Sequence, residues 1–213
     1  MTTRRPDLPR QLLDAAVALF AERTYEGTQM PAVAQRAGVG VGSIYRYFPS
    51  KEALGNAAFQ DAKRALLDEL AAAMAEGGPA RSTREEFARY WHGFTRYATA
   101  RPEAFVFLEN QQHDTFLAPG SRALTAEVDQ LSADFVQRGQ QAGEIRDGDA
   151  AELVSLALGA FTGLVKLHRP AGLGALPAES LARAEEAVWS LLHRPGEPAA
   201  APTPPPAHEG RNP

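Results

Sequence analysis

Eleven residues, GVGVGSIYRYF at positions 38–48, set a glycine-rich turn between two short stretches of helical pattern. Gly38 falls one residue past the expected end of the first stretch, where helices commonly need the left-handed backbone that glycine adopts freely, and Gly40 can cap the next helix. In that helix Ile44 and Phe48 lie on the inner side. The outer side carries Ser43, Tyr45, Arg46 and Tyr47. This order predicts a helix-turn-helix, whose second helix enters a DNA groove.

Helical periodicity continues on both sides of this run. Residues 10–23 form an amphipathic pattern with an inner face of Leu12, Ala16, Leu19 and Phe20. Thr28 is expected to cap a short helix that ends at Ala37, with Pro31 tolerated in its first turn. Ser50 is expected to cap a long helix that reaches about residue 74.

The remainder of the chain carries further helix start signals. Ser82 with Glu85, and Asp149 with Glu152, have the spacing of capping boxes, and Pro102 suits the first turn of another helix. No segment sustains the alternation of apolar and polar residues that predicts a strand. We therefore expect an all-α fold of about nine helices.

Composition and charge limit the possible classes of function. The chain has no cysteine, which excludes disulfides, thiolate zinc sites and a cysteine nucleophile and is compatible with a reducing cytoplasm. No apolar run approaches about 18 residues, so we expect no export signal and no membrane span. Residues 1–64 hold nine Lys or Arg against six Asp or Glu, whereas the rest holds thirteen against twenty. A basic N-terminal part on an acidic chain indicates a local polyanion-binding surface, although so modest a split also arises by chance.

An enzyme is the main competing class, and the sequence disfavours it. The GVGVGS segment lacks the preceding strand and the third glycine of a dinucleotide-binding loop. The histidines show no metal-ligand spacing, and no GxSxG nucleophile motif occurs. We therefore assign no catalytic residue, no metal ligand and no cofactor.

The segment TQMPAVAQRAGVGVGSIYRYFPSKEAL, together with the preceding LLDAAVALFAERTYEGT, closely resembles the DNA-binding domain of the tetracycline-repressor (TetR) family of bacterial regulators. The resemblance covers roughly residues 8–60 and is weaker beyond residue 75. It implies a helix-turn-helix DNA-binding domain at residues 1–60, a helical effector-binding and dimerisation domain at residues 61–194, and leaves residues 195–213 as a proline-rich tail. We expect that tail to be disordered, because it has almost nothing to bury.

The family implies a homodimer whose third helix enters the major groove of a two-fold operator in double-stranded DNA. Residues at the start of that helix are within reach of base edges, while tyrosines, basic residues and helix N-termini suit phosphates. The expected DNA-contacting set is Thr28, Gln29, Val41, Gly42, Ser43, Tyr45, Arg46, Tyr47 and Lys51. Arg4 and Arg5 can also reach a minor groove as an arm.

Some of these positions have alternative interpretations or depart from the family. Tyr45 and Tyr47 would also serve to cover the joint between the first and fourth helices, because aromatic side chains bury large areas. Relatives often carry Ser or Thr followed by a polar residue where this chain has Gly40 and Val41. A side-chain cap and one polar groove contact are therefore missing, and Pro31 is given no contact.

An aromatic-rich segment between residues 87 and 135 predicts either ordinary core or a ligand cavity. The family favours a cavity for a small apolar or aromatic effector, with Gln112 or His113 as orienting polar groups. The expected lining is Trp91, Phe94, Phe105, Leu108, Gln112, His113, Phe135 and Phe161.

Two apolar helical segments near residues 153–167 and 181–192 suit close helix packing, either within the subunit or in a four-helix dimer interface. The family favours the interface, with Leu153, Leu156, Ala160, Gly163, Leu181, Val188, Trp189 and Leu192 as its residues.

The sequence as a whole predicts a cytoplasmic, ligand-responsive transcriptional repressor with no membrane partner. In this hypothesis the effector stabilises a spacing of the two DNA-binding heads that no longer fits successive major grooves, and the long helix from residue 50 carries the movement. The alternative is a helical small-molecule-binding or interaction protein without effector-controlled DNA binding.

Overall fold

The computed structural model describes residues 8–109, 115–168 and 176–195, and within these residues the regular structure is helical apart from one isolated bridge between Ile145 and His193. The helices are α1 (Leu8–Arg23), α2 (Met30–Arg36), α3 (Val41–Tyr45), α4 (Lys51–Ala75), α5 (Thr83–Ala100), α6 (Pro102–Glu109), α7 (Pro119–Gln141), α8 (Ala150–His168) and α9 (Ala178–Leu192). The prediction of an all-α fold is confirmed. Arg4, Arg5, Gln112, His113 and residues 196–213 of the predicted tail lie outside the described residues.

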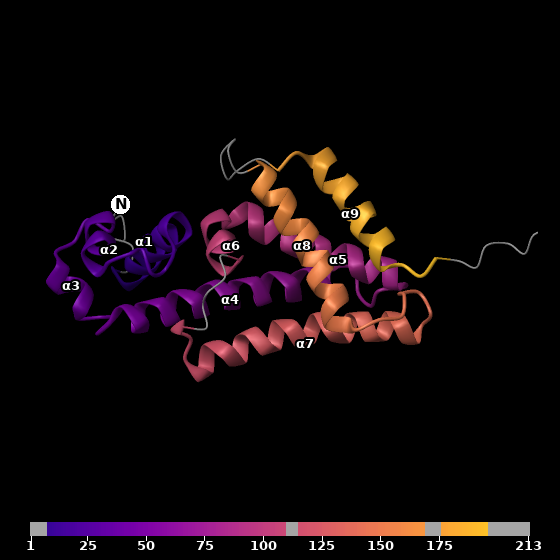
Figure 1. Ribbon diagram of the computed structural model, residues 1–213, viewed down its shortest axis with the longest axis horizontal. Helices are drawn as coiled ribbons and strands as arrows, with labels where there is room; N and C mark the ends of the chain where they lie inside the picture. Colours follow the sequence, from indigo (N-terminus) through magenta and orange to yellow (C-terminus); the bar gives the residue numbers. More distant parts are fainter. Residues whose placement is uncertain (1–7, 110–114, 169–175, 196–213) are drawn as a thin grey trace, which may run out of the picture.

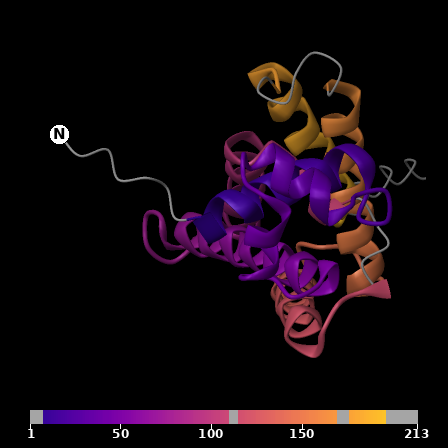
Figure 2. The same ribbon diagram turned by 90° about the vertical axis from the view of Figure 1, so that its left-hand side faces the viewer.

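The helices form two parts that share α4 (Figure 1). Helices α1 to α3 gather at one end of the molecule, and we call them the head. Helix α4 leads from the head into the remaining helices, α5 to α9, which we call the body; it contacts α1, α5, α6 and α7. Figure 2 faces the head and shows α7 on one side of the body and α8 with α9 on the other. The predicted domain boundary at residue 60 therefore falls inside one continuous helix.

Three helix starts carry the caps that the sequence predicts. Ser50, Ser82 and Asp149 each accept a hydrogen bond from a backbone amide three residues later, at 3.0, 3.1 and 3.0 Å. Such caps satisfy amides that have no partner within the helix. They fix where α4, α5 and α8 begin.

The cap predicted for α2 is wrong. Gln29 precedes α2 as its N-cap residue, without a side-chain bond, whereas Thr28 is buried in the preceding turn. The Thr28 hydroxyl donates to the Thr24 carbonyl at 2.8 Å and approaches the Leu19 carbonyl at 3.3 Å. Thr28 therefore ties the end of α1 to the turn, because a buried hydroxyl needs such partners.

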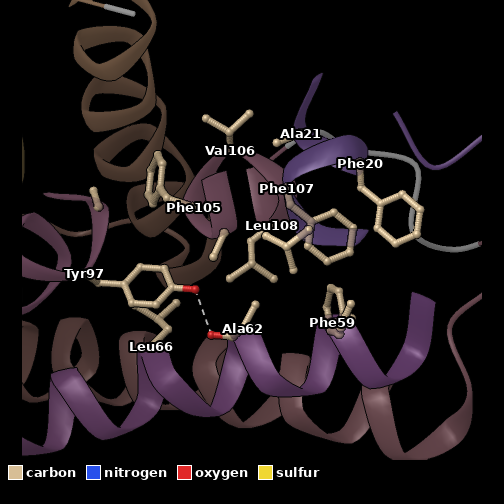
Figure 3. Packing of buried hydrophobic residues seen from close by; sticks show 14 of the residues in the cluster. Phe20, Ala21, Phe59, Ala62, Leu66, Tyr97, Phe105, Val106, Phe107 and Leu108 are labelled. Atoms are coloured by element: carbon tan, nitrogen blue, oxygen red, sulfur yellow. Dashed lines mark hydrogen bonds between the residues drawn. The ribbon is translucent and has the colours of Figure 1, made fainter. Parts of the chain in front are cut away.

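The core joins the head to the body through aromatic rings (Figure 3). Phe107 of α6 lies 5.3 Å from Phe20 of α1 and 6.3 Å from Phe59 of α4, between ring centroids. Nearby, the Tyr97 hydroxyl donates to the Ala62 carbonyl at 2.8 Å. Burial raises the pKa of Tyr97 above its ordinary range, so this phenol remains a donor. The head is thus packed directly on α6.

Candidate nucleic-acid interface and internal cavity

The turn before α3 has the geometry that its glycines predict. Gly38 has φ of +69°, the left-handed conformation, and Gly40 precedes α3 as its N-cap residue. A Cβ atom added to Gly40 or to Gly42 would meet no atom within 4 Å. The start of α3 is therefore open to an approaching surface, as base contact through its N-terminal residues requires.

Helix α3 turns one apolar side chain inward and several outward. Ile44 is fully buried, whereas Val41, Tyr45 and Tyr47 are 41%, 48% and 44% exposed. The alternative in which the two tyrosines cover a helix joint therefore does not fit the structure. Helix α3 is shorter than expected, since it ends at Tyr45, and Arg46 is its C-cap residue.

The other predicted contact residues differ in their availability. Arg46 and Gln29 are exposed, and the Arg46 guanidinium makes no hydrogen bond or ion pair with any described residue. Ser43 is half-buried. Thr28 is 1% exposed and uses its hydroxyl internally, so we withdraw it from the set. The remaining DNA contacts stay predictions.

Lys51, at the start of α4, is already engaged. Its ammonium donates to the Glu26 carbonyl at 3.2 Å and lies 4.3 Å from the centroid of the Tyr25 ring. Burial lowers the pKa of Lys51, against the opposing effect of Glu26. An ammonium has three donors, so this arrangement leaves others for a phosphate.

A cavity of about 70 Å³ lies between α5, α7, α8 and α9. Of the predicted lining residues, Trp91, Phe94, Phe135 and Phe161 border it. Phe105 and Leu108 are buried but do not; the Phe105 ring instead packs edge-on against Phe161 at 5.5 Å. Residues that the sequence analysis missed complete the lining: Phe87, Tyr90, Ser132, Val136, Val154, Ala157, Leu158, Val188 and Leu192.

The chemistry of this cavity is almost wholly apolar. No charged side chain occurs among its described lining residues, and the polar groups come from Tyr90, Trp91 and Ser132. The Ser132 hydroxyl donates to the Val128 carbonyl at 3.1 Å, and burial raises the pKa of Tyr90. The cavity therefore suits an uncharged ligand.

The residues predicted for a dimer interface divide into two groups. Leu153, Val188 and Leu192 are buried inside the subunit, so they are not available to a partner. Leu181 and Trp189 are half-buried against the core, and the ring centroids of Trp189 and Phe87 are 5.4 Å apart. The exposed group is on α8 and consists of Leu156, Ala160 and Gly163, which Gly159 and Leu167 extend. These five residues form what we call the α8 stripe.

Helix α8 is long and apolar enough to cross a membrane by length and composition alone. That property comes from two apolar sides. Phe161 and Val165 face inward, and the α8 stripe faces outward. An exposed apolar stripe of this kind indicates a partner surface.

Two family profiles match the chain. Residues 12–58 match bacterial regulatory proteins of the tetR family, and residues 59–193 match the tetracyclin repressor-like C-terminal domain. The chain belongs to the TetR family. Its members are DNA-binding regulators and not enzymes, so the family assignment agrees with the absence of a catalytic motif.

Short stretches of the chain are similar to named TetR regulators. The HTH-type transcriptional repressor KstR of Rhodococcus jostii is 57% identical over 42 residues, 20% of this chain and 20% of that protein. The fatty acid metabolism regulator protein of Bacillus subtilis is 44% identical over 52 residues, 24% of this chain and 26% of that protein. The alignments thus span about a fifth to a quarter of these relatives.

Solved TetR structures share the whole fold. A TetR family transcription regulator from Marinobacter aquaeolei has a TM-score of 0.73 at 23% identity, over 87% of this chain and 95% of that one. The ketosteroid transcriptional regulator KstR2 of Mycobacterium tuberculosis has a TM-score of 0.71 at 18% identity, over 90% and 98%. At sequence identities this low, the similarity shows that the fold is shared and shows nothing about ligand or target.

Proposed function

We propose that this TetR regulator is a cytoplasmic repressor that binds a two-fold operator as a homodimer and leaves it when a small uncharged effector enters the cavity. The observation that supports DNA binding most strongly is the orientation of α3. Ile44 is fully buried, whereas Val41 and Tyr45 of the same helix are exposed to solvent. Such an arrangement presents side chains to a major groove.

The side chains of the α3 region divide by what they can contact. Val41, Gly42 and Ser43 lie at the N-terminal end and read bases: the Val41 methyls suit a thymine methyl, and the Ser43 hydroxyl suits a base edge. The other proposed contact residues bind phosphates and so position the protein on the DNA. They are Gln29, Tyr45, Arg46, Tyr47 and Lys51.

The α8 stripe is proposed as the dimer interface. Glycine inside a helix costs about 1 kcal/mol relative to alanine. Gly159 and Gly163 stand in the middle of α8, yet a Cβ atom at either would meet nothing within 4 Å in this subunit. Packing inside the subunit therefore does not require them, whereas the close approach of a partner helix would.

Sedimentation of Gly159→Leu tests this interface, with Ala151→Leu on the exposed first turn of α8 as the control. We expect a dimer for the control and for the unchanged protein, and a folded monomer for Gly159→Leu. A monomer of the unchanged protein at micromolar concentration, or a dimer of Gly159→Leu, would contradict the assignment.

The effector is proposed to act through α6. Phe105 of α6 packs on Phe161 at the cavity, and Phe107 of the same helix packs on Phe20 in the head. A void of about 70 Å³ is smaller than a typical ligand site, so the effector must push the lining apart. A coupling of roughly 1 to 3 kcal/mol between effector and DNA is typical of such regulators.

Thermal-shift titration with indole, progesterone and decanoate tests the ligand class. We expect an uncharged probe, indole or progesterone, to raise the melting temperature and to weaken DNA binding, and the charged decanoate to do neither. Ala157→Leu, which fills the cavity, should abolish the effect, and Ala123→Leu on the exposed side of α7 should keep it. Stabilisation by decanoate alone would overturn the proposal of an uncharged ligand.

Mobility-shift titration on a duplex selected from a random pool tests DNA binding itself. We expect a two-fold sequence and an affinity that falls steeply with salt, because several phosphates are contacted. If no sequence were enriched, the chain would instead be a helical ligand-binding or interaction protein.

A further inference from the structure

A stack of aromatic rings joins the head to the body beside α4. Tyr25 lies between α1 and α2, and Phe116 lies just before α7; their rings are 3.9 Å apart and nearly parallel, at 16°. Both rings rest against the backbone of α4 at Gly55. A Cβ atom there would come within 2.7 Å of the Tyr25 ring and 3.0 Å of the Phe116 ring. Only a glycine lets the two rings approach α4 this closely.

Buried hydrogen bonds hold the Phe116 side of this stack. The Asn56 side-chain amide donates to the Phe116 carbonyl at 2.7 Å. Its side-chain oxygen accepts from the Ala118 amide and from the Ser121 hydroxyl, both at 2.7 Å. Asn56 is 8% exposed, so these bonds are made in a low-dielectric setting where losing one is costly. The segment that leads into α7 is therefore fixed on α4.

The head side of the stack ends at a cation. The Lys51 ammonium lies 4.3 Å from the Tyr25 ring centroid, within the range of a cation–π interaction, and donates to the Glu26 carbonyl at 3.2 Å. These two contacts restrict a side chain that otherwise has many rotamers. Phe116, Tyr25 and Lys51 thus form one continuous contact from the start of α7 to the start of α4.

We propose that Tyr25 is a positioning residue for DNA binding, which holds the Lys51 ammonium at the N-terminus of α4 ready for an operator phosphate while Phe116 holds Tyr25. The inference rests on the proposed DNA binding and adds a route from the start of α7 to a phosphate contact. A preorganised ammonium loses less freedom when the phosphate arrives, so it binds more tightly.

A double-mutant cycle tests this role, with affinity for the selected duplex measured as a function of salt for the full chain. Lys51→Met should lower the salt slope by about one. Tyr25→Leu should weaken binding about 3- to 10-fold, as loss of a cation–π contact implies. The double variant should bind no more weakly than Lys51→Met alone, because the tyrosine acts through the lysine. Tyr25→Phe, which keeps the ring, should bind within about twofold of the unchanged protein.

Phe94→Leu, at the cavity, is the matched control, and its effect should add to that of Lys51→Met. Additive effects of Tyr25→Leu and Lys51→Met would overturn the positioning role and leave the proposed function standing. Failure of the unchanged protein to select any duplex would overturn both. If Tyr25→Leu does not fold, Phe116→Leu replaces it in the cycle.

A measurement without DNA checks the same contact. Carbon-13 relaxation at the Lys51 ε-methylene should report a more mobile side chain in Phe116→Leu and Tyr25→Leu than in Tyr25→Phe. Equal mobility in the three variants would contradict the proposal.

Discussion

The head and the body both place aromatic side chains at the surfaces proposed to bind DNA and effector, but in opposite ways. In the head, Tyr45 and Tyr47 are turned outward over a filled core in which Ile44 and Ala34 are fully buried. In the body, aromatic rings turn inward, and Trp91 and Phe161 border a void. A filled core fixes the shape of the proposed DNA-binding surface, whereas an unfilled one leaves room for a ligand. The comparison indicates that rigidity belongs to the head and adaptability to the body.

The largest expected effect tests the filled core of the head. Ile44→Ala should lower the free energy of unfolding by about 2 to 5 kcal/mol, because the lost methyl groups leave a cavity. Its neighbour Tyr45 is 48% exposed, so Tyr45→Ala should change stability by no more than about 0.5 kcal/mol while weakening DNA binding. Urea denaturation with binding titration measures both. Equal losses of stability would remove the distinction between inner and outer sides of α3.

The next effect contrasts the two parts through one substitution. Ala34→Leu in the head should destabilise by about 1 to 3 kcal/mol, because the fully buried site has no room. Ala157→Leu at the cavity should instead stabilise by about 0.5 to 2 kcal/mol by filling space. Calorimetric melting of the ligand-free variants checks the signs. Destabilisation by Ala157→Leu would mean that the body is as tightly packed as the head.

A smaller effect concerns Lys63 of α4, whose side chain is half-buried. Its ammonium lies 5.8 Å from the centroid of the Phe59 ring, and its side chain makes no hydrogen bond or ion pair with any described residue. Burial lowers the pKa of Lys63 below its ordinary value of 10.5, against Asp129 and Glu109. Lys63→Met should therefore raise the free energy of unfolding at pH 7 by about 1 kcal/mol, and exposed Lys166→Met should not.

The pH dependence of this gain has a definite sign. Between the lowered pKa and 10.5 the unfolded chain binds more protons at Lys63 than the folded protein does. The stability of the unchanged protein, compared with Lys63→Met, should therefore rise with pH through that window, and the advantage of the variant should shrink. Denaturation at pH 7 and at several values approaching 10.5 tests this. If the difference in free energy of unfolding between the two proteins stayed constant with pH, protonation of Lys63 would not be the cause of that difference.

The smallest expected effect sharpens the role of the outward side chains in the head. Arg46→Ala should reduce the salt slope of DNA binding by about one and weaken all sequences alike, because Arg46 is proposed to contact phosphate. Ser43→Ala should instead relax preference at one position of the operator. Anisotropy titrations on the selected duplex and its single-position variants separate the two. A sequence-dependent effect of Arg46→Ala would move it to the base-reading group.

The sequence predicted local turns and helix caps better than it predicted tertiary packing, for a physical reason. The turn at Gly38 and the caps at Ser50 and Ser82 depend on local geometry, which short patterns specify. Val188 and Leu192 have the same apolar pattern whether they face a cavity or a partner subunit, so only tertiary packing decides between them. Thr28 was misplaced because a threonine can cap a helix or tie a turn from the same position.

The contacts between head and body were also beyond sequence reasoning. Tyr25 and Phe116 are far apart along the chain, and no sequence pattern predicts that their rings stack. No sequence pattern singles out Gly55 within its long helix, although two rings lie against it. Close approaches of this kind follow from the relative placement of helices, which periodicity does not specify.

The central claim is that the outward side of α3 reads DNA in a defined sequence, and selection from a random duplex pool tests it most directly. The unchanged protein should enrich a two-fold sequence. A variant with Val41→Ala, Ser43→Ala and Tyr45→Ala, folded as judged by circular dichroism, should enrich none. Enrichment of the same sequence by both proteins, or of no sequence by either, would contradict the account.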